Sequence, residues 1–308
     1  MSKELIKKKI KEISTNSFKK LVALWVTVTT LYGVLTSFLY DIVSKVSIFS
    51  SEKKINRLMY LILIIGIIII VIDSIREVLK KEAVIKVKTD RETNITIKVG
   101  NYENNMETLI TDIQNTDKDA VFVIGINNEV NGTRAQKRGV HKAIIDKFYN
   151  SEEMFKSFQR KTVKAFNNVD FTKNNFGEVG FVKHNENSKI MFVINSKNSE
   201  EQNKSIVGPN PTDIIKRIFK SLESEQVDIV QMPIISSKNV VCIGDEKIRF
   251  SIIIVEIIEE YFKQLLNDKN INYRLILSIR EEDLKDNSIT LGEIVRFIEN
   301  LKHMYHIK

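Results

Sequence analysis

Two long apolar runs near the N-terminal end dominate the hydrophobic pattern of this chain. Leu21–Tyr40 holds 20 residues without a charge, and Leu58–Ile72 holds 15 residues, eight of them isoleucine. At about 1.5 Å per residue, a helix over the first run would span about 30 Å, which is the thickness of a bilayer's hydrocarbon core. The second would span about 22 Å, and Arg57, Asp73 and Arg76 beside it could reach outward and complete the crossing. The pattern predicts two transmembrane helices, with a buried core helix as the alternative for each.

From residue 93 onward, short apolar runs rich in β-branched residues alternate with stretches of helical period. The expected strands cover 95–99, 120–126, 180–183, 189–195, 227–234 and 274–279. The expected helices cover about 105–114, 140–149, 152–166, 210–222, 247–266 and 291–301. This alternation is typical of a sheet with helices on both faces. The predicted fold class is therefore α/β: two N-terminal transmembrane helices followed by a three-layer α/β/α domain.

The predicted organisation has four parts. They are a basic N-terminal segment (1–20), a transmembrane helical hairpin (21–76), a junction (77–92) and a ligand-binding domain (93–308).

Charge is unevenly placed along the chain, whose net charge is +8. Residues 1–92 carry 17 basic and 9 acidic side chains, whereas residues 93–308 carry 30 of each. A nucleic-acid-binding domain is expected to carry its basic excess on the folded part, because neutralising phosphate drives such binding. We therefore expect no nucleic-acid partner and attribute the basic excess to membrane topology.

The basic residues that flank the apolar runs predict an orientation. Residues 1–20 carry seven Lys and residues 73–92 carry six basic side chains, against four in the intervening range 41–57. Since basic flanks stay in the cytoplasm, we expect a multi-pass protein of the cell membrane with both termini cytoplasmic. The single cysteine, Cys242, agrees with a reducing compartment and excludes an intramolecular disulfide.

Small residues recur at a spacing of four along the first apolar run, at Thr29, Gly33 and Ser37. Such a face lets helices approach each other closely. Its partner is either the second apolar run of the same chain or another copy of the protein, and the sequence leaves both open.

Two loops follow buried strands and precede helices, which is where α/β proteins bind ligands. The loop 127–141 and the residues directly after it place five cationic or imidazole side chains between residues 130 and 145 with no acid among them, Arg138 and His141 included. Beside Gly139 this is either a cradle for a diphosphate or a solvated basic loop. Asn127, at the strand end, could bond a ribose hydroxyl or cap a turn. The loop 235–246 is polar and has no distinctive signal of its own.

No catalytic constellation is present in the sequence. The chain has four histidines and shows no Ser-His-Asp, metal-ligand or P-loop spacing. We expect a binding module, not an enzyme, with no catalytic residue, no metal and no resident cofactor.

Taken in order, the motifs resemble a known family. Two N-terminal spans are followed by KVGNY, DAVFVIGINNEVNG, RGVHKAIIDKF, NFGEVGFV and DIVQMPIISS. This order is similar to that of the transmembrane macro-domain type of ThsA effector in Thoeris antiphage defence, over essentially the whole chain. The resemblance implies a macro domain that binds an ADP-ribose-derived signal, such as histidine-ADP-ribose, made by a partner TIR-domain protein. Binding then implies homo-oligomerisation, disruption of the lipid bilayer and abortive infection of the bacterial host.

The resemblance also implies site residues. Gly100 and Asn101 match the turn that holds adenine, with Asn replacing the usual Asp, and Asn127 matches the Asn near the distal ribose. The His-bearing loop is matched by Arg138, Gly139 and His141, and the second phosphate loop by Ser236, Ser237 and Lys238. The Gly-rich loop of ADP-ribose-removing macro domains is missing from the sequence, which disfavours hydrolysis. The alternatives are a membrane-anchored ADP-ribosyl hydrolase and a passive membrane scaffold for ADP-ribosylated partners.

Overall fold

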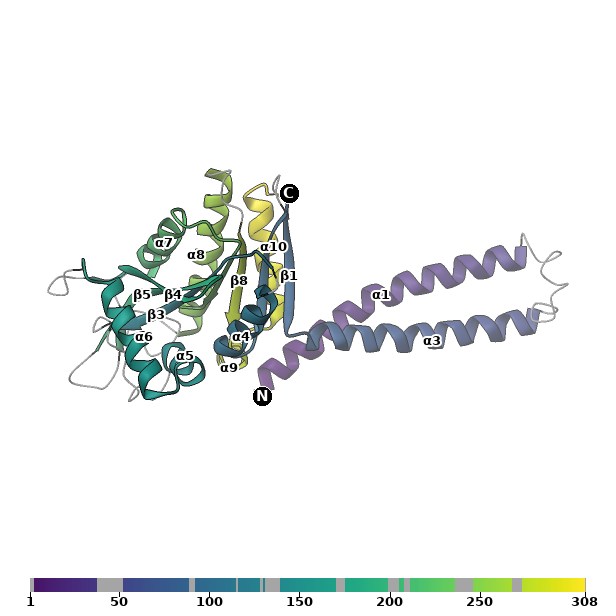
Figure 1. Ribbon diagram of the computed structural model, residues 1–308. Helices are drawn as coiled ribbons and strands as arrows, with labels where there is room; N and C mark the ends of the chain where they lie inside the picture. Colours follow the sequence, from purple (N-terminus) through teal and green to yellow (C-terminus); the bar gives the residue numbers. More distant parts are fainter. Residues whose placement is uncertain are drawn as a thin grey trace. The chain divides into compact units, whose positions relative to one another are not determined.

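The computed structural model of the chain divides into two compact units, Met1–Lys80 and Lys81–Lys308, which are described separately (Figure 1). The structure describes residues 3–37, 52–88, 92–114, 116–127, 130, 139–169, 175–198, 205–207, 211–235, 246–267 and 273–307.

The N-terminal unit contains two long helices that pack along each other, α1 (Lys3–Ser37) and α3 (Glu52–Leu79). The ammonium of Lys20 lies 2.5 Å from a carboxylate oxygen of Asp73. A Cβ added to Gly66 would lie 2.6 Å from a methyl group of Leu24, so glycine permits the close contact here. Apart from its chain neighbours and the backbone of its own helix, no described atom lies within 4 Å of a Cβ built on Gly33. A close approach within this unit is thus made at Gly66, and Gly33 has room for a side chain.

One helix among the described residues is long and apolar enough to cross a membrane, judged by length and composition. It is Asn56–Arg76, with 21 residues, a mean hydropathy of 2.9 and 11% of its apolar stretch buried within the protein. The expected second span, Leu58–Ile72, lies inside it. The expected first span, Leu21–Tyr40, begins in α1, and residues 38–40 lie outside the described residues. The described helices therefore contain one candidate for the two expected crossings.

The second unit is built on one mixed sheet in the order β1-β2-β8-β7-β3-β5-β4, with β6 paired to β5. The strands are β1 (Glu82–Lys88), β2 (Glu92–Val99), β3 (Ala120–Asn127), β4 (Val179–Asn185), β5 (Ser188–Asn198), β6 (Ser205–Val207), β7 (Ile229–Pro233) and β8 (Arg274–Ile279). The central strands β2, β8, β7, β3 and β5 are parallel, and β1 and β4 pair antiparallel with their neighbours.

Helices cover both faces of this sheet (Figure 1). They are α4 (Tyr102–Ile113), α5 (Val140–Phe148), α6 (Glu152–Ala165), α7 (Pro211–Leu222), α8 (Glu246–Asn267), α9 (Glu281–Asp286) and α10 (Leu291–Met304). Alternate residues of β3 point to opposite layers: Phe122 packs with α4, α5 and α6, whereas Val123 packs with α7, α8 and α10. The predicted three-layer α/β/α arrangement is confirmed.

Two local differences from the expected elements have physical causes. The segment expected as a junction, 77–92, contains β1, because Ile85 and Val87 alternate with polar residues and bury their side chains against the sheet. The range 281–286, to which no element was assigned, forms α9. The apolar stretch FSIIIVEII lies within α8, as predicted, and its residues Phe250 and Ile257 are fully buried.

Candidate ligand-binding crevice between β3 and β7

Five parallel strands end at one edge of the sheet, and several of the predicted site residues lie at that edge. Gly100 and Asn101 directly follow β2, and Asn127 is the last residue of β3. Because parallel strands share the edge at which they end, these residues from distant parts of the sequence lie along the same rim of the domain.

The strand order reverses between β3 and β7. These two neighbours pair only over Ala120–Phe122 and Ile229–Gln231. The chain leaving β3 continues into α5 on one face, whereas the chain leaving β7 continues into α8 on the other face. In open α/β sheets a crevice forms where such connections diverge, and ligands bind there. The two loops singled out in the sequence, 127–141 and 235–246, follow these two adjacent strands.

Tyr102, the first residue of α4, reaches the border between β3 and β7, where the crevice is expected. Its hydroxyl is 3.0 Å from the carbonyl oxygen of Val123 in β3 and 3.0 Å from that of Gln231 in β7. The side chain is 2% exposed, and burial raises the pKa of the phenol well above its ordinary value. The hydroxyl is therefore protonated and acts as a shared hydrogen-bond donor to both carbonyls at the point where the two strands stop pairing. Sequence reasoning missed this residue, whose one signal was an aromatic side chain directly after the Gly100–Asn101 turn.

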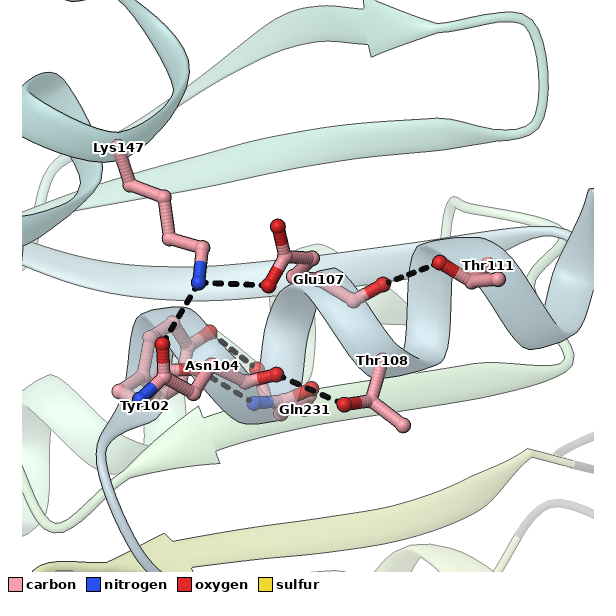
Figure 2. A network of polar contacts seen from close by, with 7 residues as sticks. All are labelled: Tyr102, Asn104, Glu107, Thr108, Thr111, Lys147 and Gln231. Atoms are coloured by element: carbon pink, nitrogen blue, oxygen red, sulfur yellow. Dashed lines mark hydrogen bonds and ion pairs between the residues drawn. The ribbon is translucent and has the colours of Figure 1, made fainter.

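A polar network ties the first turn of α4 to β7 and β8. The side-chain amide of Gln231 donates to the Tyr102 carbonyl at 3.4 Å (Figure 2). It also donates to the Ser278 hydroxyl at 3.0 Å. The amide of Asn105 donates to the same hydroxyl at 3.3 Å. Among the described residues, the buried Oε1 of Gln231 has no hydrogen-bond partner. The network holds the start of α4 in a defined place above the sheet.

The Gly100–Asn101 turn is held by the neighbouring strand. Gly100 has a φ of 156° and donates its N–H to the Ile279 carbonyl of β8 at 2.9 Å. Asn101 precedes α4 as its N-cap residue, is exposed, and makes no capping hydrogen bond with its side chain. Its amide group therefore faces solvent at the rim, where it can bond a ligand.

Asn127 is fixed at the end of β3 by an irregularity in the ladder. The register with β5 shifts after Ile126, so that Asn127 lies opposite Ser196 and Asn195 is the extra residue. The Asn127 carbonyl accepts a hydrogen bond from the Val130 N–H at 3.2 Å, and its side chain is 9% exposed. The bulge aims the strand end at the crevice.

His141 lies in the hydrophobic layer beside the loop. Its ring meets Phe192 edge-on, with ring centres 5.5 Å apart, and is 6% exposed. Burial lowers the pKa of the imidazole from 6.5 to about 4, so the ring is neutral at pH 7. Gly139, two residues earlier, is exposed and adopts a φ of 114° at the start of α5. Any positive charge that the loop offers at neutral pH therefore comes from its Arg and Lys side chains.

Four of the predicted contacts, Arg138, Ser236, Ser237 and Lys238, lie outside the described residues. Among the described residues, no group of three or more His, Cys, Asp or Glu side chains could hold a metal ion.

The glycines of the NFGEVGF motif have packing roles. A Cβ on Gly177, whose φ is 83°, would lie 2.6 Å from the Arg217 side chain, and one on Gly180 would lie 2.7 Å from the Phe166 ring. Both positions require the absence of a side chain for close packing, and neither belongs to the crevice.

No protein-family model matches this sequence, and no curated protein matches it. Solved structures with similarity to the chain include several macrodomains. The Oceanobacillus iheyensis macrodomain with MES bound is 14% identical, with a TM-score of 0.46, and the match covers 71% of this chain and 99% of that one. The same macrodomain with ADP is 14% identical, with a TM-score of 0.42, and the match covers 72% of this chain and 100% of that one. A macrodomain protein from Streptomyces coelicolor is 13% identical, with a TM-score of 0.32, and the match covers 53% of this chain and 89% of that one.

Proposed function

We propose that this protein is a membrane-anchored effector that binds an ADP-ribose-derived signal in the crevice between β3 and β7. The observation that carries the proposal is the reversal of strand order between these strands, because the two loops chosen from the sequence follow these adjacent strands. The divergence of the chain after β3 and β7 supports a crevice at this place, and the motif resemblance supports the class of ligand.

The spacing of the site suits a ligand with two ends. The Gly100–Asn101 turn follows β2, and β8 and β7 lie between β2 and the crevice. At about 4.8 Å between neighbouring strands, the turn and the crevice are roughly 12 Å apart along the rim. A nucleobase alone cannot bridge that distance, whereas a base, ribose and diphosphate together can. We assign the base to the turn, the diphosphate to the start of α5 at Gly139 and the distal ribose to Asn127.

Anion binding in this proposal depends on the Arg and Lys side chains of the loop. His141 is neutral, and Lys142 forms an ion pair with Asp146 one turn along α5. We therefore assign the diphosphate contact to Arg138, with Ser236, Ser237 and Lys238 closing the other wall. Arginine suits this task because its planar fork binds phosphate oxygens in pairs.

The N-terminal helices serve as the membrane anchor in this proposal, with both termini in the cytoplasm. The apolar surface of α3 supports a crossing, and hydroxyls in α1 are satisfied inside the helix. Thr27 donates to the Ala23 carbonyl at 2.9 Å and Thr30 donates to the Val26 carbonyl at 2.8 Å. Such internal bonding is what a helix in lipid requires. We propose that both helices cross the bilayer as a hairpin.

The proposed effector acts by assembly. A TIR-domain protein supplies the diffusible signal, and ligand binding favours a homo-oligomer whose spans disrupt the bilayer and abort phage infection. Binding can shift this equilibrium only as far as the ligand prefers the assembled state, and a tenfold preference corresponds to about 1.4 kcal/mol per site. Several linked sites would give a sharp response. No nucleic acid and no catalytic turnover take part.

Calorimetry on the full chain in detergent micelles tests the ligand assignment. We expect ADP-ribose and histidine-ADP-ribose to bind, and Arg138→Ala to weaken binding at least tenfold, about 1.4 kcal/mol. The matched control is Arg160→Ala, which removes an exposed arginine from α6 and should leave the affinity unchanged. Absence of binding, or wild-type affinity in Arg138→Ala, contradicts the proposal.

Vesicle leakage separates the effector from its two rivals. The effector requires that ligand addition increase both particle size in light scattering and dye release from vesicles that contain the protein. Turnover of ADP-ribosyl groups without leakage would identify the membrane-anchored hydrolase, and binding without either effect would identify the passive scaffold.

A further inference from the structure

Tyr102 connects the two halves of the candidate site through a single side chain. Its backbone directly follows the Gly100–Asn101 turn at the end of β2, and its hydroxyl reaches Val123 of β3 and Gln231 of β7. The residue therefore spans the rim from the turn to the base of the crevice.

The contacts around Tyr102 leave it little freedom to move. Gln231 receives a hydrogen bond at its carbonyl from the Tyr102 hydroxyl and returns one from its side-chain amide to the Tyr102 carbonyl. Farther along α4, the ammonium of Lys147 from α5 lies 2.6 Å from Glu107 and 2.6 Å from the side-chain oxygen of Asn104 (Figure 2). The helix is thus held at its start by β7 and along its length by α5.

We propose that Tyr102 is a positioning residue that sets the spacing between the turn and the crevice, and so selects ligands that occupy both. This inference rests on the proposed function, because it assigns the two ends of an ADP-ribose-type ligand to those two places. The affinity of a ligand that occupies only the turn does not depend on this spacing. One that carries a second phosphate and a distal ribose must fit both ends at once, and it loses affinity when the spacing is no longer held.

Removing the hydroxyl leaves the two strand carbonyls at the β3/β7 border without their shared donor. In Tyr102→Phe the ring still fills its place and the Gln231 amide can still donate to the backbone carbonyl of residue 102, but the hydrogen bonds from the hydroxyl to the strand carbonyls at the β3/β7 border are lost. A matched control exists on the opposite face of the sheet. Tyr261 of α8 is also fully buried and donates its hydroxyl to the Tyr273 carbonyl at 2.7 Å. Tyr261→Phe makes the same chemical change away from the crevice.

The experiment measures binding of ADP-ribose and of AMP to the full chain in detergent micelles. AMP lacks the second phosphate and the distal ribose. We expect Tyr102→Phe to weaken ADP-ribose binding about tenfold and AMP binding by less than about twofold, and Tyr261→Phe to change neither by more than about twofold. Equal losses for both ligands, no loss, or the same loss in Tyr261→Phe would overturn the inference. If the wild-type protein binds neither ligand, the proposed function has failed as well, and this outcome is distinct from the others.

Hydrogen exchange on the wild-type protein keeps the test decisive if Tyr102→Phe does not fold. We expect ADP-ribose to slow exchange both in the first turn of α4 and in β7, and AMP to slow it in the first turn of α4 alone. Protection by ADP-ribose that is confined to one of these segments would overturn the inference.

Discussion

The two units of this protein use the same residue types in opposite ways. In α3, Ile68 and Ile69 are 52% and 59% exposed, whereas Ile257 of α8 is fully buried. The α/β unit covers its isoleucines with its own layers, because a sheet with helices on both faces has an inside. Two helices packed side by side have no such enclosed interior. The comparison shows that the isoleucines of α3 need a surrounding that the described N-terminal unit does not supply, which is the physical basis for proposing lipid.

The largest expected effect comes from removing side-chain volume inside the α/β unit. Ile257→Ala should lower the free energy of unfolding by about 2–5 kcal/mol, because it removes buried methyl groups and leaves a cavity. The same change at Ile69 should cost less than about 0.5 kcal/mol. Thermal unfolding in detergent, followed by circular dichroism, measures both. Equal losses would show that α3 is packed as a core helix.

A charge on α3 tests what surrounds it. Ile68→Asp should disfavour membrane insertion by about 3 kcal/mol and shift the protein from the membrane fraction to the soluble one. Ile252→Asp is the matched control, since Ile252 of α8 is similarly exposed at 49% but lies in the α/β unit. Flotation of vesicles on a density gradient gives the readout. If Ile68→Asp floats like the wild type, α3 does not cross the bilayer.

Acid should affect the α/β unit selectively, because all four histidines lie in it. Burial lowers the pKa of His141 from 6.5 to about 4, so the unfolded state binds a proton at a higher pH than the folded state does. Stability is therefore complete above about pH 6.5 and falls as the pH drops toward 4, with a loss of about 2 kcal/mol at pH 5.

The variant His141→Phe should lose less stability between pH 7.5 and pH 5 than the wild type does. At pH 7.5 its free energy of unfolding should differ from that of the wild type by less than the loss of about 2 kcal/mol expected for the wild type at pH 5. Unfolding by urea at pH 5 and at pH 7.5 provides the comparison. An unchanged pH dependence in the variant would remove His141 as its cause.

Much of the fold could be read from local patterns, and the exceptions are instructive. The alternation in 93–308 predicts the layers, and the glutamates that continue FSIIIVEII place that stretch in α8. The strand β1 was missed because its short alternation, with Ile85 and Val87 inward, was assigned to a junction. Its burial depends on pairing with β2, which no local pattern reports.

The site divides in the same way. Asn127 could be chosen because it ends an apolar strand, and strand ends are visible in the sequence. Gly100 and Asn101 form a visible turn after a strand, and the motif resemblance implied their role in binding. Tyr102 and Gln231 could not, since their contact joins positions 129 residues apart. His141 was grouped with the cations of its loop, although its neighbour Phe192 comes from a distant strand and leaves the imidazole neutral.

What the chain's own order of residues determined is therefore everything that periodicity encodes: the apolar runs, the strand and helix alternation, and the loops that follow strands. Only the tertiary structure decided that β3 and β7 are neighbours, that the Tyr102 hydroxyl contacts a carbonyl of each strand, and that His141 is buried. The physical reason is that periodicity is a property of consecutive residues, whereas strand order, burial and the pKa of a side chain are set by partners brought from elsewhere in the chain.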